Sequence, residues 1–185
     1  FIDVHTHDDN LLFRDPDMTH KTSQGVTPAG VGNCGISLAP LVLGGKPPPP
    51  PLDLLGNGDD YRFEHFGDYL DALDETPAAA NAAFLIGHST LRLGTMSDVE
   101  RPATAGEIGR MAKIVEDAMD AGATGFSTGL IYAPNKAAPT DEIVALADAL
   151  KGQKSAEKAL EKAEASAAEA LAEAQGEAKT IQKAL

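Results

Sequence analysis

The chain has 185 residues and carries 28 acidic against 15 basic side chains, a formal net charge of −13. All of the excess negative charge falls in residues 1–150, which hold 22 acidic and 9 basic side chains. A surface of this sign repels phosphate backbones, so nucleic acid is not expected as a partner. The length is enough for one ordinary domain with a hydrophobic core.

Cysteine usage and hydropathy narrow the expected cellular setting. The single cysteine, Cys34, excludes an internal disulfide framework and fits a reducing compartment, so we expect a cytoplasmic protein. No stretch approaches the ~18 consecutive apolar residues of a membrane span, so no membrane partner is expected. No signal peptide is visible, and the chain starts on a strand-like run without an initiating Met, as an excerpt of a longer protein would.

Strand-like and helix-like segments alternate along residues 1–150, the pattern of βα units around a parallel sheet. The expected strands are residues 1–4, 25–32, 81–87 and 124–129. Pro28 is an awkward strand residue because it gives the ladder no N–H. Between Gly44 and Asp60 a segment rich in Pro and Gly, with five prolines at 47–51, predicts a stiff extended loop.

Three helices are expected between and after these strands. Phe66, Tyr69, Leu70 and Leu73 mark one face of the first. A T-x-x-E capping box, Thr104 with Glu107, opens the second, and Gly122 is its natural end. The apolar stripe of this second helix is Ile108, Met111, Val115 and Met119. Thr140 is expected to cap the third helix. Its expected buried face is Ile143, Leu146 and Leu150.

The composition changes sharply after Gly152. Residues 153–185 contain no proline and no aromatic residue, and Ala, Glu and Lys dominate. Apolar residues recur at steps of three, four and seven along a thin, mostly alanine seam that includes Leu160, Leu171, Ile181 and Leu185. The sequence therefore predicts two parts, 1–152 and a helical tail at 153–185. We expect the tail to cover an open sheet edge or to self-associate.

Two histidines close the first expected strand. Side chains two apart on a strand point to the same face, so His5 and His7 can reach one metal ion. Strand carboxyl ends are also where catalytic groups gather in parallel α/β folds. The carboxylates of Asp8 and Asp9 follow directly and could orient the imidazoles. A pair of solvated surface histidines is the alternative interpretation.

Cys34 is the second candidate ligand. A lone cysteine is often a small buried apolar residue. Here, however, it lies between Asn33 and Gly35 at the end of the second expected strand, where the backbone can turn sharply and present a thiolate. The pattern alone leaves both interpretations open.

A family resemblance rests on five segments of the chain. In order they are FIDVHTHDD, QGVTPAGVGNCGISLAP, PPPLDLL, IGHSTLR and GFSTGLIYAP. Together they resemble the N-acyl-D-amino-acid deacylases of the amidohydrolase superfamily. The HxH pair alone indicates only the superfamily, whereas GNCG, GHSTLR and STGLxY are much more specific. The resemblance covers most of residues 1–150 and none of 153–185.

The resemblance implies zinc-dependent hydrolysis of N-acyl-D-amino acids to a carboxylate and a D-amino acid. It implies the α/β fold of a (β/α)8 barrel, which typically takes about 250 residues, so this chain would hold the first half followed by the alanine-rich helical tail. The metal ligands that it implies are His5, His7 and Cys34. Ile131 and Tyr132 match the wall of the substrate pocket.

Four further residues are expected behind these ligands or at the rim of the site: Asp8, Asp9, Asn33 and His88. For His88 a satisfied structural histidine is the alternative. The family also takes two histidine ligands and a catalytic aspartate from later strands. This chain has histidines only at 5, 7, 20, 65 and 88, and no residue matches the aspartate. We therefore expect weak activity, or none, from this chain alone.

Two rival functions remain open on the sequence. In the first, the chain is an inactive barrel fragment or scaffold whose helical tail pairs with a partner. In the second, the substrate is a cyclic amide or ureide, as in hydantoinases and dihydroorotases. Cys34 argues against the second, because it stands where those relatives use a metal-bridging lysine.

Overall fold

Parallel β-strands form the centre of the protein, seen here in a computed structural model that describes residues 1–150. These residues belong to one unit, Phe1–Gly152. The helix predicted for 153–185 lies outside the described residues, so the tail, its self-association and the division at 152 stay predictions. No helix in the described part of the chain is both long and apolar enough to cross a membrane.

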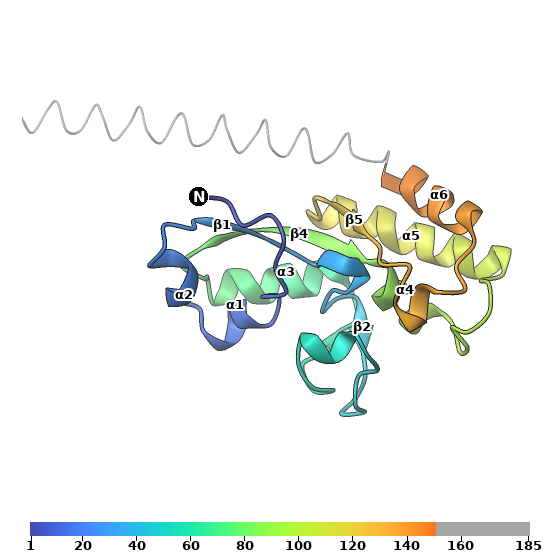
Figure 1. Ribbon diagram of the computed structural model, residues 1–185, viewed down its shortest axis with the longest axis horizontal. Helices are drawn as coiled ribbons and strands as arrows, with labels where there is room; N and C mark the ends of the chain where they lie inside the picture. The colour runs from blue at the N-terminus through green and yellow to red at the C-terminus, as the bar shows by residue number, and fades with distance from the viewer. Residues whose placement is uncertain (151–185) are drawn as a thin grey trace, which may run out of the picture. The chain divides into compact units, whose positions relative to one another are not determined.

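Three strands make the main sheet in the order β1 (Pro28–Val31), β4 (Asn81–Gly87) and β5 (Gly125–Ser127), all parallel. Figure 1 shows β1 and β4 running side by side. The first half of β4 pairs with β1 and its second half pairs with β5. The predicted α/β class with a parallel sheet is confirmed. Three of the four strands expected from the sequence form within their predicted ranges.

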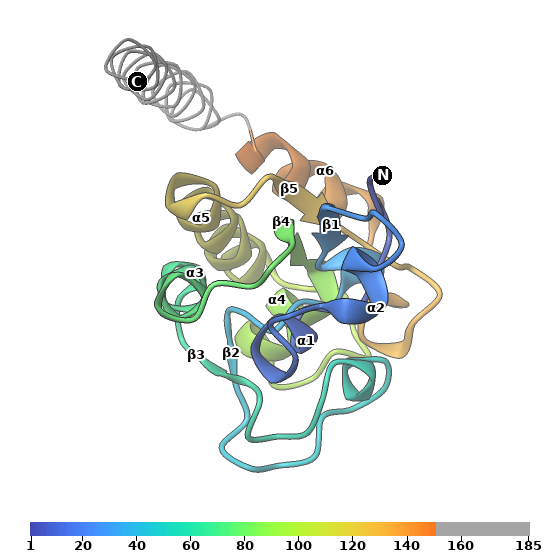
Figure 2. The same cartoon turned by 90° about the vertical axis from the view of Figure 1, so that its left-hand side faces the viewer.

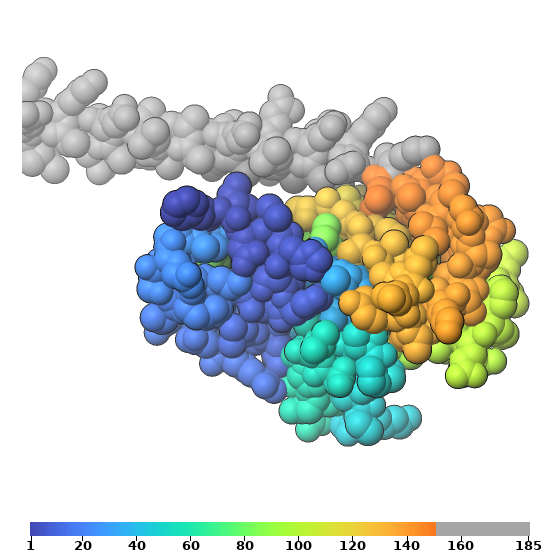
Figure 3. Space-filling view, viewed as in Figure 1, coloured from blue at the N-terminus to red at the C-terminus, as the bar shows by residue number. Residues whose placement is uncertain are grey.

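The fourth expected strand, residues 1–4, is reduced to a single parallel bridge between Asp3 and Ala29. Its apolar side chains at Phe1, Ile2 and Val4 are exposed, so burial does not hold the segment flat against the sheet. The segment lies at the surface, dark blue in Figure 3. Pro28 is tolerated as the first residue of β1, where its carbonyl accepts the Asp3 N–H.

Helices α3 (Phe66–Glu75) and α5 (Ala105–Ala121) pack together on one side of the sheet, as Figure 2 shows. The predicted box at Thr104 and Glu107 is present, and Gly122 ends α5. Because Met111, Val115 and Met119 are fully buried, the predicted stripe of α5 is confirmed as part of the core.

Helix α6 (Thr140–Ala149) differs from its prediction in two ways. Pro139, not Thr140, is the N-cap residue, and the Asp141 side chain accepts the Glu142 N–H. The buried face also differs from the predicted one at two of its three positions. Leu146 is buried as predicted, but Glu142 and Ala149 are buried in place of Ile143 and Leu150. The sequence pattern missed this because a carboxylate occupies a core position.

Short elements that the sequence did not predict fill the connections. They are the helices α1 (Leu11–Arg14), α2 (Thr19–Thr22) and α4 (His88–Thr95), the 3-10 turns η1 (Asn33–Gly35), η2 (Leu52–Leu54) and η3 (Ala133–Asn135), and the antiparallel strands β2 (Leu41–Val42) and β3 (Arg62–Phe63). Most have four residues or fewer, too few to show a period. The expected proline-rich loop joins β2 to β3 and contains η2.

A buried ion pair between Arg92 of α4 and Glu142 of α6 explains the unusual stripe. Both side chains are fully buried, and Arg92 Nη1 donates to both carboxylate oxygens of Glu142. The remaining Arg92 donors reach three backbone carbonyls, those of Pro134, Val99 and Arg101. All five guanidinium N–H groups thus have an acceptor, which is what makes a buried charge tolerable.

His88, the first residue of α4, completes this network. Its Nε2 lies 2.9 Å from Glu142 and its Nδ1 lies 2.9 Å from Thr128 Oγ1. Burial is the largest influence on the pKa of His88 and lowers it, although Glu142 opposes this. Since a carboxylate can only accept, Nε2 carries the proton and Nδ1 accepts from the hydroxyl of Thr128.

We predict that Glu142→Ala lowers the free energy of unfolding by roughly 3–5 kcal/mol, because it leaves the Arg92 guanidinium buried and unpaired. Urea unfolding followed by circular dichroism measures the loss. Asp117→Ala is the matched control, since Asp117 forms an exposed pair with Lys113 on α5 and such pairs contribute about 0.3–0.5 kcal/mol. Equal effects of the two substitutions would contradict the prediction.

Candidate metal centre

The carboxyl ends of the parallel strands bring the predicted site residues to one edge of the sheet. The bridged segment at Asp3 leads into His5 and His7, and β1 leads into the turn that carries Cys34. β5 ends at Ser127, directly before Thr128. In parallel α/β folds this edge is where binding and catalytic groups collect.

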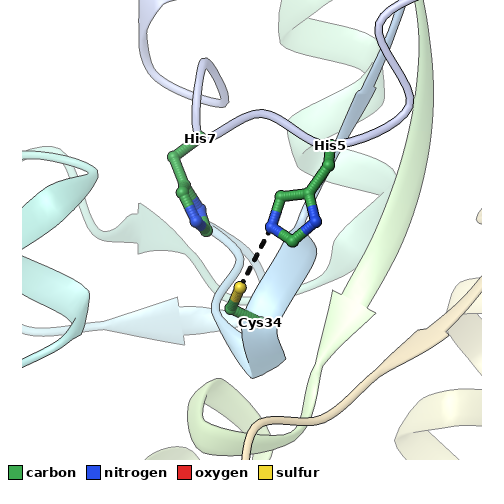
Figure 4. A group of neighbouring side chains, drawn as sticks. All are labelled: His5, His7 and Cys34. Atoms are coloured by element: carbon green, nitrogen blue, oxygen red, sulfur yellow. Dashed lines mark hydrogen bonds between the residues drawn. The ribbon is translucent and has the colours of Figure 1, made fainter.

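His5, His7 and Cys34 come together as the sequence predicted. One donor atom from each lies within 4.8 Å of the other two. His5 Nε2 is 3.1 Å from Cys34 Sγ, and the two imidazole rings stand edge to face with centroids 5.7 Å apart. Figure 4 shows both imidazoles descending from the amino-terminal segment toward the sulfur. Among the described residues, no other cluster of three such donors meets the same criterion.

This donor set fits a zinc ion. Zinc prefers tetrahedral nitrogen and sulfur ligands, at about 2.0–2.1 Å for imidazole and 2.3 Å for thiolate, so its donors lie roughly 3.3–3.6 Å apart. His7 Nδ1 is buried and has no hydrogen-bond partner within residues 1–150. Burial, and next the charge of His5, lower the pKa of His7 below its usual range, with Asp8 opposing. A neutral imidazole is the form that binds metal.

Cys34 lies in a turn with an uncommon backbone. Its φ of 57° and ψ of 18° are left-handed, as are the φ angles of 78° at Gly32 and 82° at Gly35. A non-glycine residue in this region costs about 1–2 kcal/mol, so the surrounding contacts must hold it there. At Gly32 a side chain is also excluded, because a Cβ would lie 2.0 Å from the Leu85 carbonyl oxygen.

Two polar side chains hold this turn. Ser127 accepts the Gly35 N–H at 2.9 Å and donates its hydroxyl to the Gly32 carbonyl, so it bridges both ends of the turn. Asn33 donates to the carbonyls of Gly30 at 2.7 Å and Thr6 at 3.2 Å. Because Thr6 lies between the two histidines, Asn33 joins the cysteine turn to the histidine segment. It therefore lies behind the three candidate ligands.

The two carboxylates after His7 contact groups other than the imidazole rings that they were expected to orient. Asp8 pairs with Lys21 at 3.0 Å. Asp9 is buried, and its side chain accepts the Gly32 N–H, while burial raises the pKa of Asp9 to about 7. Asp8 therefore joins the segment after His7 to α2, and Asp9 joins it to the turn before Cys34.

The predicted pocket residues follow the β5 turn. The Tyr132 side chain hydrogen-bonds to Cys34, and the charge of Cys34 is the largest influence that raises the pKa of Tyr132. Its ring packs over Gly129, where a Cβ would lie 2.6 Å from the ring and 2.5 Å from the Cys34 carbonyl oxygen. The Ile131 side chain is 85% exposed beside it. Tyr132 thus contacts Cys34, one member of the candidate cluster, whereas His88 is satisfied in the buried network with Glu142.

Two residues of this site were missed in the sequence. Lys21, which pairs with Asp8, lies in a short helix without a recognisable pattern, and nothing local marks it. Ser127 was noted only within the STGLxY segment, although a hydroxyl at a strand end beside the glycine-rich turn was a usable signal. Both contacts depend on the tertiary fold, at separations of 13 and 92 residues.

The chain matches the family described as "Amidohydrolase family" over residues 1–181. The chain belongs to the amidohydrolase family. The match runs past residue 152, where the resemblance was expected to stop, so it includes most of the alanine-rich segment of this amidohydrolase.

Curated relatives of this amidohydrolase include two deacylases of Alcaligenes xylosoxydans xylosoxydans. It is 57% identical to a D-aminoacylase over 150 residues, which cover 81% of this chain and 31% of the relative. It is 51% identical to an N-acyl-D-aspartate deacylase over 156 residues, which cover 84% of this chain and 31% of the relative. The chain therefore spans about a third of the length of these proteins.

Solved structures agree with this placement. A D-aminoacylase solved for a study of its binuclear metal centre matches with a TM-score of 0.78 and 53% identity, over 81% of this chain and 31% of the other. An N-acyl-D-glutamate deacylase from Bordetella bronchiseptica, complexed with zinc and a phosphonate inhibitor, matches with a TM-score of 0.71 and 42% identity. That match covers 80% of this chain and 31% of the other.

We predict that Ser127→Ala destabilises the protein by about 1–3 kcal/mol, because it leaves the Gly35 N–H without an acceptor and the Gly32 carbonyl without its donor. Thermal and urea unfolding measure the change. Ser89→Ala is the matched control, since the Ser89 hydroxyl is buried with no hydrogen-bond partner among the described residues. The prediction fails if Ser127→Ala is no more destabilising than Ser89→Ala.

Proposed function

We propose that residues 1–150 form the first half of a (β/α)8 barrel in a zinc-dependent hydrolase of N-acyl-D-amino acids, and that His5, His7 and Cys34 hold the ion. The observation that carries the proposal is the meeting of these three donors, within 4.8 Å of one another, at the carboxyl edge of a parallel sheet. The 57% identity to a D-aminoacylase supports the choice of substrate class.

The order and pairing of the strands in the main sheet favour the proposed barrel. Its strands follow one another in sequence order, from the bridged Asp3 through β1 and β4 to β5, with parallel pairing at each step. Residues 81–84 of β4 pair with β1, whereas residues 85–87 pair with β5. Such a displacement of register between neighbouring strands is what closing a sheet into a tilted barrel requires.

The choice of zinc rests on donor chemistry. A thiolate with two imidazoles is a borderline-soft set, which suits zinc better than magnesium or calcium, since these prefer oxygen. Cu²⁺ generally binds such donors more tightly than Zn²⁺ does, so which ion is bound also depends on which metal is available. One related deacylase was solved with zinc, and a D-aminoacylase variant was solved with copper chloride.

The residues of this chain have separable roles in amide hydrolysis. A zinc ion bound there supplies a Lewis acid that polarises the amide carbonyl and lowers the pKa of water. His5, His7 and Cys34 fix its position, and Tyr132 with Ile131 lines one wall for the acyl group or side chain. Asp8 and Asp9 are held by Lys21 and by the Gly32 N–H, so neither is placed to collect the proton.

We predict that the full chain binds zinc weakly, because residues 1–150 offer three protein ligands and no fourth. The variants Cys34→Ala and His5→Ala should bind zinc far more weakly still. Each variant removes a ligand, so its loss of zinc affinity should exceed the roughly 10–100-fold loss that follows when a residue behind the ligands is removed. Equilibrium dialysis with metal analysis measures the affinity. His65→Asn is the control, because it removes an imidazole and keeps an N-cap side chain at α3. Equal zinc binding by all four proteins would contradict the metal assignment.

We predict that the 185-residue chain hydrolyses N-acyl-D-amino acids roughly 10²–10⁴-fold more slowly than a relative of full family length, because it contains no residue that matches the proton-transferring aspartate. Release of D-amino acid from N-acetyl-D-methionine, with and without a chelator, measures the rate. Turnover equal to that of the longer relative, and abolished by the chelator, would show that another carboxylate of this chain does the work.

A further inference from the structure

The ammonium of Lys21 lies at the centre of a small cluster beneath the histidine segment. Its Nζ contacts Asp3 Oδ2 at 2.5 Å, Asp8 Oδ2 at 3.0 Å and Thr6 Oγ1 at 3.4 Å. Asp3 and Thr6 accept hydrogen bonds from the ammonium, and Asp8 adds an ion pair. The Lys21 side chain is only 16% exposed, so these contacts are partly shielded from water.

The three acceptors are spaced along the segment that carries the proposed ligands. Asp3 precedes His5, Thr6 lies between the two histidines, and Asp8 follows His7. The second oxygen of Asp3 accepts the backbone N–H of His5 at 3.3 Å. One ammonium thus contacts side chains on both sides of each histidine in the segment.

Backbone hydrogen bonds to residues 27–30 hold only the first part of this segment. Four are formed: the Thr27 N–H to Phe1, the Asp3 N–H to Pro28, the Gly30 N–H to Asp3 and the Thr6 N–H to Gly30. None of these four reaches His7 or Asp8. Apolar packing adds little, because the Phe1, Ile2 and Val4 side chains are exposed. Polar side chains therefore add restraint where these backbone bonds end, with Asn33 from the cysteine turn and Lys21 from α2.

We propose that Lys21 is a positioning residue of the metal centre, which holds residues 3–8 so that His5 and His7 face Cys34. The proposal rests on the proposed metal site, although its structural half can be tested without metal. Lys21 itself contacts none of the three ligands, so its effect passes through Asp3, Thr6 and Asp8. Its charge also offsets two carboxylates that would otherwise repel each other along the same segment.

The test compares Lys21→Met, which keeps the apolar length without the charge, with Lys21→Arg, which restores a cation with several donors. Lys113→Met is the matched control, because Lys113 pairs only along the exposed side of α5. Two readouts are taken on the full chain. Hydrogen exchange at the His5 and Thr6 amides is followed without metal, and Co²⁺ affinity is followed through the thiolate-to-metal absorption of the bound ion.

We expect Lys21→Met to accelerate exchange at both amides, to leave the β4 amides unchanged and to weaken Co²⁺ binding by about 10–100-fold. The absorption at saturation should match that of the wild type, because all three ligands remain. Lys21→Arg should recover most of the affinity, and Lys113→Met should behave as the wild type in both readouts.

Unchanged exchange at His5 and Thr6 in Lys21→Met would overturn the proposal, whatever the metal does. Faster exchange with undiminished Co²⁺ affinity would also overturn it, because Lys21 would then restrain the segment without positioning the metal ligands. Faster exchange in a protein whose wild type binds no Co²⁺ would refute the metal site while supporting the restraint of residues 3–8 by Lys21.

Discussion

The left-handed turn from Gly32 to Gly35 is the constraint on which the rest of the site depends. It places Cys34 at a φ of 57°, and only this turn directs the sulfur from the end of β1 toward the histidine segment. The neighbouring chain is built around it. Ser127 bridges its two ends, and Gly129 approaches the Cys34 carbonyl too closely for a side chain. Strain of this kind persists where the surroundings over-determine it, and it is concentrated at functional sites.

A second group of polar contacts holds the histidine segment, which the cysteine turn faces. Asn33 and Lys21 contact the histidine segment from two different elements. Asn33 belongs to the cysteine turn, and Lys21 belongs to α2. Behind the end of β5, Thr128 joins His88, which in turn contacts Glu142. The edge of the sheet is therefore held by directional bonds, whereas the core below it is held by apolar burial.

The sequence predicted those features that depend on local pattern. The box at Thr104 and Glu107 and the apolar stripe of α5 follow from spacing alone, and β4 follows from its apolar run. The meeting of His5, His7 and Cys34 was also predicted, because strand carboxyl ends share one edge. That these residues bind zinc rests on chemistry and family likeness, and it stays a prediction.

What the sequence could not give depends on partners far away in the chain. At the start of α6 the prediction named Ile143 and missed Glu142, because Glu142 is a core residue only when Arg92, 50 residues earlier, supplies the opposite charge. The strand expected at residues 1–4 became a single bridge because its apolar side chains have no surface to cover among the described residues. Lys21 could not be found without the fold that brings Asp3 and Asp8 together around it.

X-ray absorption at the zinc edge tests the central claim most directly, because it reports the atoms bound to the ion. The account predicts one sulfur at about 2.3 Å together with nitrogen or oxygen neighbours at about 2.0–2.1 Å in the zinc-loaded chain, with the sulfur contribution lost in Cys34→Ala. A first shell without sulfur in the wild-type chain would contradict it, since Cys34 would then lie beside the ion without binding it.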